Sequence, residues 1–178
     1  MFCKSNDSPE VARRQALIAA IGTATQAFQR STDAFDDVVA QHLGLNRTDL
    51  RCLDWLFDGP KTAGQLAAAT GLSSAATTTL LDRLERRGLV RRVRDTADRR
   101  KVLVEMTELG WRQTGEYYAP LAQEGARLLE QYTDAQLTAM RDHLLTATAL
   151  IDRHRARIRG DAGQVTRGDR RSRRGPDR

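Results

Sequence analysis

The chain has 178 residues, a mass of 19.9 kDa and a formal net charge of +6, which suits one domain with extensions. Its mean hydropathy is −0.55, no apolar run approaches the roughly 18 residues of a membrane span, and the N-terminus lacks a secretory signal, so we expect a cytoplasmic protein without a membrane partner. Two cysteines and three histidines lie too far apart for a disulfide framework or a zinc cluster, and we expect no cofactor or metal.

The N-terminal part of the chain has the periodicity of helices. Apolar residues recur at three- and four-residue spacing over 10–42, which predicts one long helix, or two with a joint near Gly22. Gly44 is typical of a helix C-terminus. A second helix is predicted over 45–57, before the turn formers of 58–60.

Two short helices are predicted in close succession. Thr62 and Gln65 have the spacing of a capping box, and Gly71 follows as a tight turn. The serines at 73 and 74 then cap a helix predicted over 74–87. A short helix, a glycine-containing turn and a second helix form the helix-turn-helix pattern.

After Gly88 the pattern becomes that of strands. The β-branched runs 89–94 and 100–105 flank a loop of turn formers, which predicts a β-hairpin. Two strands are marginal alone, so the hairpin is expected to pack against the helices.

The C-terminal part is again helical in pattern. One helix is expected from about Trp111, with a kink or restart at Pro120, and Thr133 is expected to cap a last helix with one apolar stripe. From Gly160 onward the chain is Gly, Asp and Arg with almost no apolar residue, which predicts disorder.

The positive charge is concentrated in two places. Residues 83–101 hold nine basic and three acidic residues, a local +6, and residues 153–178 hold ten arginines and three aspartates, a local +7. The rest of the chain therefore carries −7. An acidic body with two basic patches favours a polyanionic partner, most often nucleic acid.

Together these elements predict a mainly α fold with a small β-hairpin wing, a winged helix-turn-helix flanked by long N- and C-terminal helices. The flanking helices carry more apolar surface than one domain needs, so we expect them to pair two copies into a homodimer. The expected divisions are a flexible N-terminus at 1–9, an N-terminal dimerisation helix at 10–44, a winged helix-turn-helix DNA-binding domain at 45–110, C-terminal dimerisation helices at 111–159 and a disordered Arg-rich tail at 160–178.

Four sequence motifs in this order resemble the MarR-type transcriptional regulators. They are the run around Thr70-Gly71-Leu72-Ser73, the run from Leu81 to Val90 with its Asp-Arg-Leu-Glu start, the wing Asp95-Thr96-Ala97-Asp98-Arg99-Arg100, and Thr107-Glu108-Leu109-Gly110. The resemblance implies a homodimeric repressor or activator that binds pseudo-palindromic double-stranded DNA. It also implies that a small ligand or oxidation often lowers the DNA affinity.

The helix over 74–87 is expected to face the DNA. Small polar residues on its first turns allow a close approach to base edges, and free N–H groups at its start can hold a phosphate. The expected contacts are Ser73, Ser74, Ala75, Thr78, Thr79 and Arg83. In the alternative interpretation, the serines are only caps and the threonines only a solvated face. We expect Arg83 and Arg87 to contact phosphates or to brace Asp82 and Glu85 rather than to read bases.

The hairpin tip supplies the expected wing contacts. The resemblance implies that a wing arginine enters the minor groove, and Arg94, Arg99 and Arg100 lie nearest the tip. We expect Asp98 to brace one of these arginines while another binds DNA. The Arg-rich tail adds weak backbone affinity or serves only as a solubilising extension.

A ligand pocket is expected where the flanking helices meet the winged domain. His42, Arg47, Trp55, Trp111, Tyr117 and Tyr118 are candidate linings for a small aromatic or anionic effector, although each also suits ordinary packing. Cys52 is expected to be a buried structural thiol, and Cys3 lies in the N-terminal tail.

Two other functional classes compete with a dimeric sequence-specific regulator. One is a winged-helix module for nonspecific chromosome or RNA binding, dominated by the tail; aromatic residues are only 5% of the chain and absent from the basic hairpin, which disfavours base stacking. The other is an enzyme, against which stand the absence from the sequence of a glycine-rich phosphate loop, a metal-spaced cluster and a Ser/Cys–His pairing.

Overall fold

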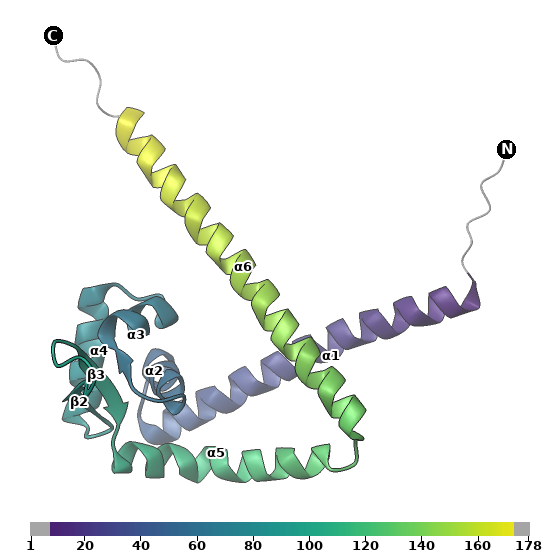
Figure 1. Ribbon diagram of the computed structural model, residues 1–178, viewed down its shortest axis with the longest axis horizontal. Helices are drawn as coiled ribbons and strands as arrows, with labels where there is room; N and C mark the ends of the chain where they lie inside the picture. The colour runs from purple at the N-terminus through teal and green to yellow at the C-terminus, as the bar shows by residue number, and fades with distance from the viewer. Residues whose placement is uncertain (1–7, 173–178) are drawn as a thin grey trace. The chain divides into compact units, whose positions relative to one another are not determined.

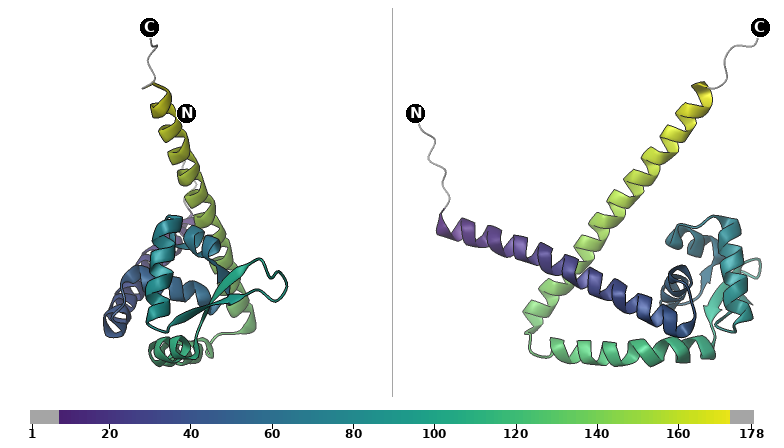
Figure 2. Two further views of the ribbon diagram at one scale, coloured as in Figure 1. Left: turned by 90° about the vertical axis from the view of Figure 1, so that its left-hand side faces the viewer. Right: turned by 180° about the vertical axis from the view of Figure 1, so that it is seen from behind.

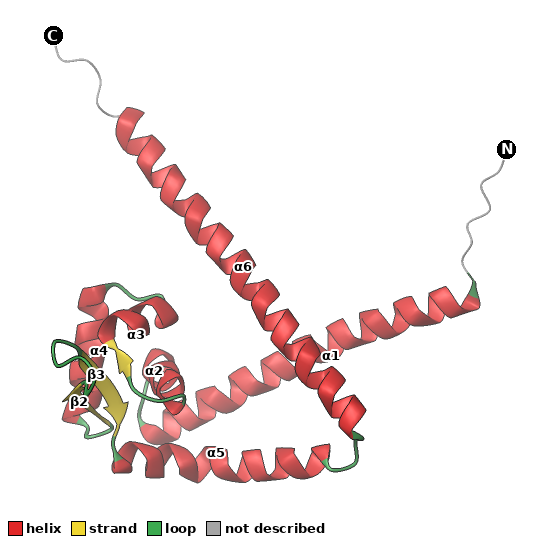
Figure 3. Ribbon diagram, in the orientation of Figure 1, coloured by secondary structure: helices red, strands yellow, loops and turns green. Residues whose placement is uncertain are grey.

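The computed structural model describes the backbone of residues 8–172 and the side chains of residues 8–160. Helices alternate with a small sheet in the order α1 (Pro9–Leu43), α2 (Arg47–Phe57), β1 (Lys61–Thr62), α3 (Ala63–Thr70), α4 (Ser74–Arg86), β2 (Val90–Arg94), β3 (Val102–Met106), α5 (Glu108–Leu129) and α6 (Asp134–Ser172) (Figure 1). The predicted class, mainly α with a hairpin wing, is confirmed (Figure 3). The chain divides into two compact units, and the boundary along the chain falls between Pro120 and Leu121.

Helix α1 is a single helix that passes Gly22 without a break. The Ser8 hydroxyl accepts the N–H of Val11 at its start, and Gly44 closes it at φ +60°, in the left-handed region that favours glycine. Of the two predicted forms of this segment, the structure has the uninterrupted one.

The helix-turn-helix is built by the caps that the sequence predicts. Thr62 accepts from the N–H of Gln65 at 3.2 Å, and the Gln65 side chain accepts from the N–H of Thr62 at 2.8 Å, which completes the capping box of α3. Gly71 ends α3 at φ +78°, and the Ser73 hydroxyl caps α4. These three signals fix the turn that sets α4 against α3.

The sheet has one strand more than predicted. Strands β2 and β3 form the expected antiparallel hairpin, with Val90 opposite Met106 and Arg94 opposite Val102. β1 pairs with the other edge of β3, in the order β1-β3-β2. Two residues are too short to show a period of two, so the sequence pattern gave no sign of β1. The loop between β2 and β3 projects away from the helices of its own unit (Figure 2, left).

The helices and the sheet of the winged domain enclose a hydrophobic core. Leu53, Leu66 and Leu84 are completely buried, and the residues that surround them come from α1, α2, α3, α4 and the sheet. The buried apolar set is Val39, Ala40, Leu45, Leu50, Cys52, Leu53, Leu56, Leu66, Leu80, Leu81, Leu84, Leu89, Val90, Val104 and Met106. The core therefore anchors the inner face of α4 and leaves its outer face to solvent.

Helix α5 begins earlier than predicted. The Thr107 hydroxyl accepts from the N–H of Gly110 at 3.0 Å, so the helix begins at Glu108 rather than near Trp111. Pro120 lies inside α5, where its missing N–H removes one helical hydrogen bond, but it does not end the helix.

Helix α6 begins where the Thr133 cap predicted and extends to Ser172. The expected disordered tail at 160–178 is thus helical in its first part, because an existing helix extends without the cost of a new nucleus and arginine is a good helix former. The rest of that tail, 173–178, and residues 1–7, with Cys3, lie outside the described residues. No helix within 8–172 is long and apolar enough to cross a membrane.

Gly110 is expected to be the most sensitive glycine of the fold. A Cβ at this position would lie 2.3 Å from the carbonyl oxygen of Leu89, a backbone atom that cannot rotate away. We expect Gly110→Ala to lower the free energy of unfolding by about 1–3 kcal/mol, the usual cost of overpacking. Gly115→Ala, in the same helix with open space around it, is the control and should be neutral or stabilising by about 0.5–1 kcal/mol. Urea unfolding checks both, and equal effects would contradict the close approach.

Candidate nucleic-acid interface

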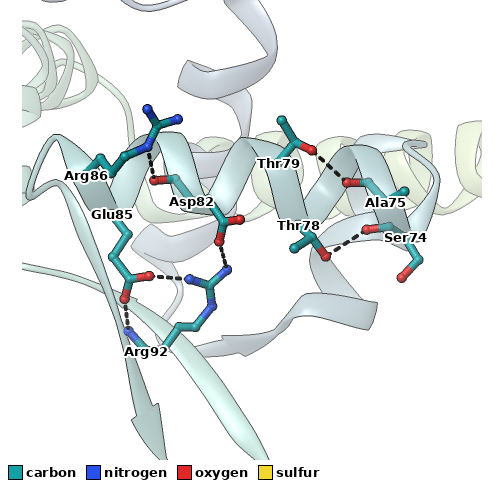
Figure 4. A network of polar contacts seen from close by, with 8 residues as sticks. All are labelled: Ser74, Ala75, Thr78, Thr79, Asp82, Glu85, Arg86 and Arg92. Atoms are coloured by element: carbon teal, nitrogen blue, oxygen red, sulfur yellow. Dashed lines mark hydrogen bonds and ion pairs between the residues drawn. The ribbon is translucent and has the colours of Figure 1, made fainter.

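The outer face of α4 consists of small, exposed residues. Thr77, Leu80, Leu81 and Leu84 are buried on the inner face, as the predicted stripe requires. On the outer side, Ser73, Ser74, Ala75, Thr78 and Thr79 are all exposed, and Figure 4 shows the last four along the first two turns. The structure therefore places together, on one accessible surface, the residues that the sequence assigned to the base-facing side.

The two outer threonines use their hydroxyl protons within the helix. Thr78 donates to the carbonyl of Ser74 and Thr79 to the carbonyl of Ala75, each at 3.1 Å (Figure 4). Each oxygen keeps its capacity to accept a hydrogen bond, and the methyl groups add apolar surface. This face offers acceptors and methyl groups to a partner.

Three arginines surround the tip of the wing with open guanidinium groups. Arg94, Arg99 and Arg100 are exposed, and within the described part of the chain no carboxylate or carbonyl pairs with their side chains. These are the three wing residues that the sequence singled out. Their positive charge is fully available to an outside anion.

Asp98 braces the wing, but not through an arginine side chain. Its carboxylate accepts from the backbone N–H of Arg100 at 3.1 Å and lies 3.6 Å from Nζ of Lys101. Its carbonyl also accepts from the N–H of Lys101. The expected arginine pair is wrong because an Asx turn, which is local in the chain, satisfies the carboxylate first.

Arg83 faces inward, to a partner that the sequence did not suggest. Its guanidinium binds Asp49 through Nε at 3.1 Å and through a second, shorter contact. The side chain of Asp49 is only 3% exposed, and the hydrogen bond that Arg83 donates to it raises the pKa of Arg83. The predicted brace on Asp82 and Glu85 is therefore wrong, and Arg83 ties α4 to the first turn of α2. These partners lie 34 positions apart, beyond the reach of local patterns.

Arg87 and Arg91 are also held within the domain. Arg87 donates to the carbonyls of Leu43 and Gly44 at the end of α1. Arg91 binds Glu105 of the neighbouring strand at 2.7 Å. The local charge of the 83–101 patch is thus partly satisfied internally.

Arg92 joins the wing to α4 (Figure 4). Its guanidinium contacts Asp82 at 2.6 Å and also binds Glu85, and its backbone N–H donates to Glu85 at 3.2 Å. The hydrogen bond that Arg92 donates to Asp82 is the largest of the effects that raise the pKa of Arg92. The sequence analysis did not predict this pairing, although the three-residue spacing of Asp82 and Glu85 places both acids on one face of the predicted helix.

The predicted ligand pocket is only partly assembled. A cavity of about 250 Å³ is lined by Arg47 and Tyr118, whereas His42, Trp55 and Trp111 do not line it. His42 packs against Tyr117, Trp111 packs edge-on to Phe57 with ring centroids 5.0 Å apart, and Trp55 packs on the core. His42, Trp55 and Trp111, which the sequence suggested as ligand contacts, are therefore engaged in packing within the first unit.

The cavity is more acidic than the sequence analysis expected. The remaining lining residues are Thr32, Asp33, Asp36, Leu50, Arg51 and Asp54. Burial and the neighbouring Asp36 raise the pKa of Asp54, while burial and a 2.7 Å hydrogen bond to Asp36 raise the pKa of Tyr118. Three carboxylates against two arginines make the lining net negative, which does not suit an anionic molecule.

Cys52 is buried, as the sequence predicts. It is 1% exposed, and burial together with the charge of Asp49 raises the pKa of its thiol to about 12. Both observations agree with the expected structural role, because the reactive form of a cysteine is the thiolate.

The Arg83–Asp49 pair is expected to contribute to stability. Arg83→Gln leaves a buried carboxylate without its charged partner, which costs about 1–3 kcal/mol of unfolding free energy. Arg86→Gln on the same helix is the matched control, because Arg86 donates only to the carbonyl of Asp82 and is exposed. Urea unfolding of both variants is the measurement, and a control as destabilised as Arg83→Gln would contradict the assignment.

Sequence relatives agree with this geometry. The sequence model of the MarR family matches residues 43–101, from the end of α1 to the wing. The uncharacterized HTH-type transcriptional regulator YcgE of Bacillus subtilis (strain 168) is 34% identical over 141 residues, which are 77% of this chain and 92% of the relative. The chain belongs to the MarR family of transcriptional regulators.

Solved structures share the fold. A MarR family protein from Bacillus stearothermophilus superposes with a TM-score of 0.57 at 24% identity, covering 77% of this chain and 96% of that one. RV1404 from Mycobacterium tuberculosis superposes with a TM-score of 0.53 at 25% identity, covering 75% and 92%. The resemblance drawn from the sequence motifs is confirmed, and the α4 face and the wing arginines belong to a MarR-type winged helix-turn-helix.

Proposed function

We propose that this MarR-family protein is a homodimeric repressor that binds a pseudo-palindromic site in double-stranded DNA. In this proposal α4 lies in the major groove and the loop between β2 and β3 reaches the adjacent minor groove. This proposal rests on two features of the surface. The side chains on the outer face of α4 are small and uncharged over its first two turns, and the arginines without internal partners lie at the wing.

The chemistry of α4 favours contact with A·T-rich steps. Thr78 and Thr79 have their hydroxyl protons engaged in the helix, so methyl groups and acceptor oxygens remain for the bases. A methyl group suits the thymine methyl, and an accepting oxygen suits the amino groups of adenine or cytosine. The start of α4 adds free N–H groups and the Ser74 hydroxyl for a phosphate.

The wing arginines suit a narrow minor groove. Arg94, Arg99 and Arg100 need not give up an internal ion pair to bind DNA, so their full charge is available. A guanidinium is favoured in the enhanced negative potential of a narrow A·T-rich groove. We assign the broad, salt-dependent part of the affinity to these three residues.

Pairing of two copies is supported by apolar surface on both flanking helices. Phe28 on α1 is 72% exposed, and Leu144 and Ile158 on α6 are 65% and 68% exposed. The other exposed large apolar residues of these helices include Val11, Leu17, Ile18, Ile21, Val38, Met140, Leu145, Leu150 and Ile151. Monomeric soluble proteins rarely leave such stripes uncovered, and a two-fold dimer would cover them.

Footprinting on the promoter next to the protein's own gene tests the proposal. We expect protection of an inverted repeat, with specific binding well above that to random DNA, and lower transcription when the protein is present. Equal affinity for random DNA, lost when residues 160–178 are deleted, would favour the nonspecific tail-driven alternative. Protection that raises transcription would contradict repression.

We extend the proposal to release of DNA by a small molecule in the cavity beside Tyr118. The net negative lining favours a compact cation over the anion that the sequence suggested. Thermal unfolding and DNA binding are measured with benzylamine, which is a cation at neutral pH, and with benzoate, an anion of similar size. We expect the amine alone to raise the melting temperature and weaken DNA binding, and a response only to the carboxylate would contradict this.

A further inference from the structure

Two carboxylates on the recognition helix hold an arginine of the wing. Asp82 and Glu85 of α4 both contact the guanidinium of Arg92 on β2, and Glu85 also accepts its backbone N–H (Figure 4). The side chains are only partly covered, with exposed fractions of 52%, 39% and 32% for Asp82, Glu85 and Arg92. The triad therefore lies at the surface that faces DNA in the proposed function.

The two carboxylates offset the positive charge of Arg92 at the surface that faces DNA in the proposed function. Asp82 lies one helical turn beyond Thr78, on the same side of α4. Its carboxylate repels phosphates, and Arg92, bound to two acids, cannot neutralise a phosphate without breaking both pairs. Charge that a phosphate cannot reach adds nothing to sequence-independent binding.

We propose that Asp82 and Glu85 are specificity-determining residues that restrain Arg92 and so suppress nonspecific affinity for DNA. The inference rests on the proposed DNA-binding function and deepens it. Base contacts from the first turns of α4 do not depend on this restraint, whereas backbone contacts anywhere on a duplex would gain from its loss. The contacts among Asp82, Glu85 and Arg92 therefore increase the difference in affinity between the correct site and random DNA.

The test compares two neutralised variants of the full chain. Asp82→Asn with Glu85→Gln frees Arg92 in each subunit, and Asp142→Asn with Asp152→Asn is the control, because it neutralises two arginine-paired aspartates on α6. Affinities for the selected palindrome and for a random duplex of equal length are measured by fluorescence anisotropy over a range of salt concentrations. Circular dichroism establishes that both variants are folded.

Release of Arg92 in the Asp82/Glu85 variant should increase mainly the affinity for random DNA. We expect the Asp82/Glu85 variant to bind the random duplex about tenfold or more tightly than wild type, and its logarithmic salt slope to steepen by up to about 1.8, since each newly neutralised phosphate contributes about 0.9. The palindrome should gain less, so the specificity ratio falls. The control should change neither slope nor ratio.

Other outcomes overturn the inference. If the Asp82/Glu85 variant binds random DNA no better than the control does, the acids do not restrain Arg92. If Arg92→Gln makes the salt slope shallower by about 1.8 while the Asp82/Glu85 variant leaves it unchanged, Arg92 already contacts phosphate in the wild type. Absence of palindrome binding by the wild type would instead contradict the proposed function, so the two failures are distinguishable.

Discussion

Replacement of Arg94, Arg99 and Arg100 by alanine is expected to weaken binding to the palindromic site by about 100-fold or more at moderate salt. Within the 83–101 patch, these three side chains carry the charge that no internal partner takes up, and a dimer presents each of them twice. The logarithm of the affinity should also depend less on salt, with a slope shallower by up to about 5, because each lost phosphate contact removes about 0.9. Anisotropy titrations at several salt concentrations measure both quantities.

The matched control removes three other exposed arginines. Arg112, Arg127 and Arg153 lie on α5 and α6, outside the winged domain, so their replacement by alanine changes the net charge equally. We expect affinity to fall by less than about threefold in this control, through long-range electrostatics alone. Equal losses in the two triple variants would mean that net charge, and not the wing, governs binding.

Introduction of charge into the apolar stripe of α6 is expected to break the dimer. Leu144→Glu with Ile151→Glu places two carboxylates seven residues apart on one helical face, where the native side chains are 65% and 57% exposed in a single chain. In a dimer that buries this face, two uncompensated charges per subunit would cost several kcal/mol, enough to dissociate it. Sedimentation should then give the mass of one chain, and palindrome affinity should fall to that of a single half-site.

Ala135→Glu is the control for the dimer prediction. At 100° per residue this position lies on the opposite side of α6 from Leu144 and Ile151, and it is exposed. We expect this variant to remain dimeric and to bind the palindrome as wild type does. A wild-type chain that sediments as a monomer, or a stripe variant that stays dimeric, would contradict the proposed role of α6.

Local signals in the sequence predicted the frame of the molecule well. The capping box of Thr62, the left-handed Gly71 and the Ser73 cap each specify their turn through neighbours three or four residues away. The alternation after Gly88 likewise marked the hairpin. The sequence did not predict β1, because its pairing with a distant strand, and not a local pattern, forms it.

The charges were harder to predict than the elements. The sequence located the basic patch on the recognition helix and the wing, but its arginines look alike in sequence and differ in partners. Arg83 binds a carboxylate 34 positions away, and Arg92 binds two acids of the preceding helix. Only three-dimensional contacts separate the arginines that have partners inside the domain from those that have none. The same holds for the cavity, whose acidic lining combines α1, α2 and Tyr118.

Selection of binding sites from a pool of random duplexes tests the central claim most directly, since it presupposes no promoter. The account predicts enrichment of an inverted repeat whose half-site centres lie about one helical turn apart, roughly 10–10.5 base pairs, with A·T pairs under the wing. Enrichment that disappears in the Arg94/Arg99/Arg100 variant would agree with it. Recovery of single half-sites without two-fold symmetry, or of no preferred sequence at all, would contradict it.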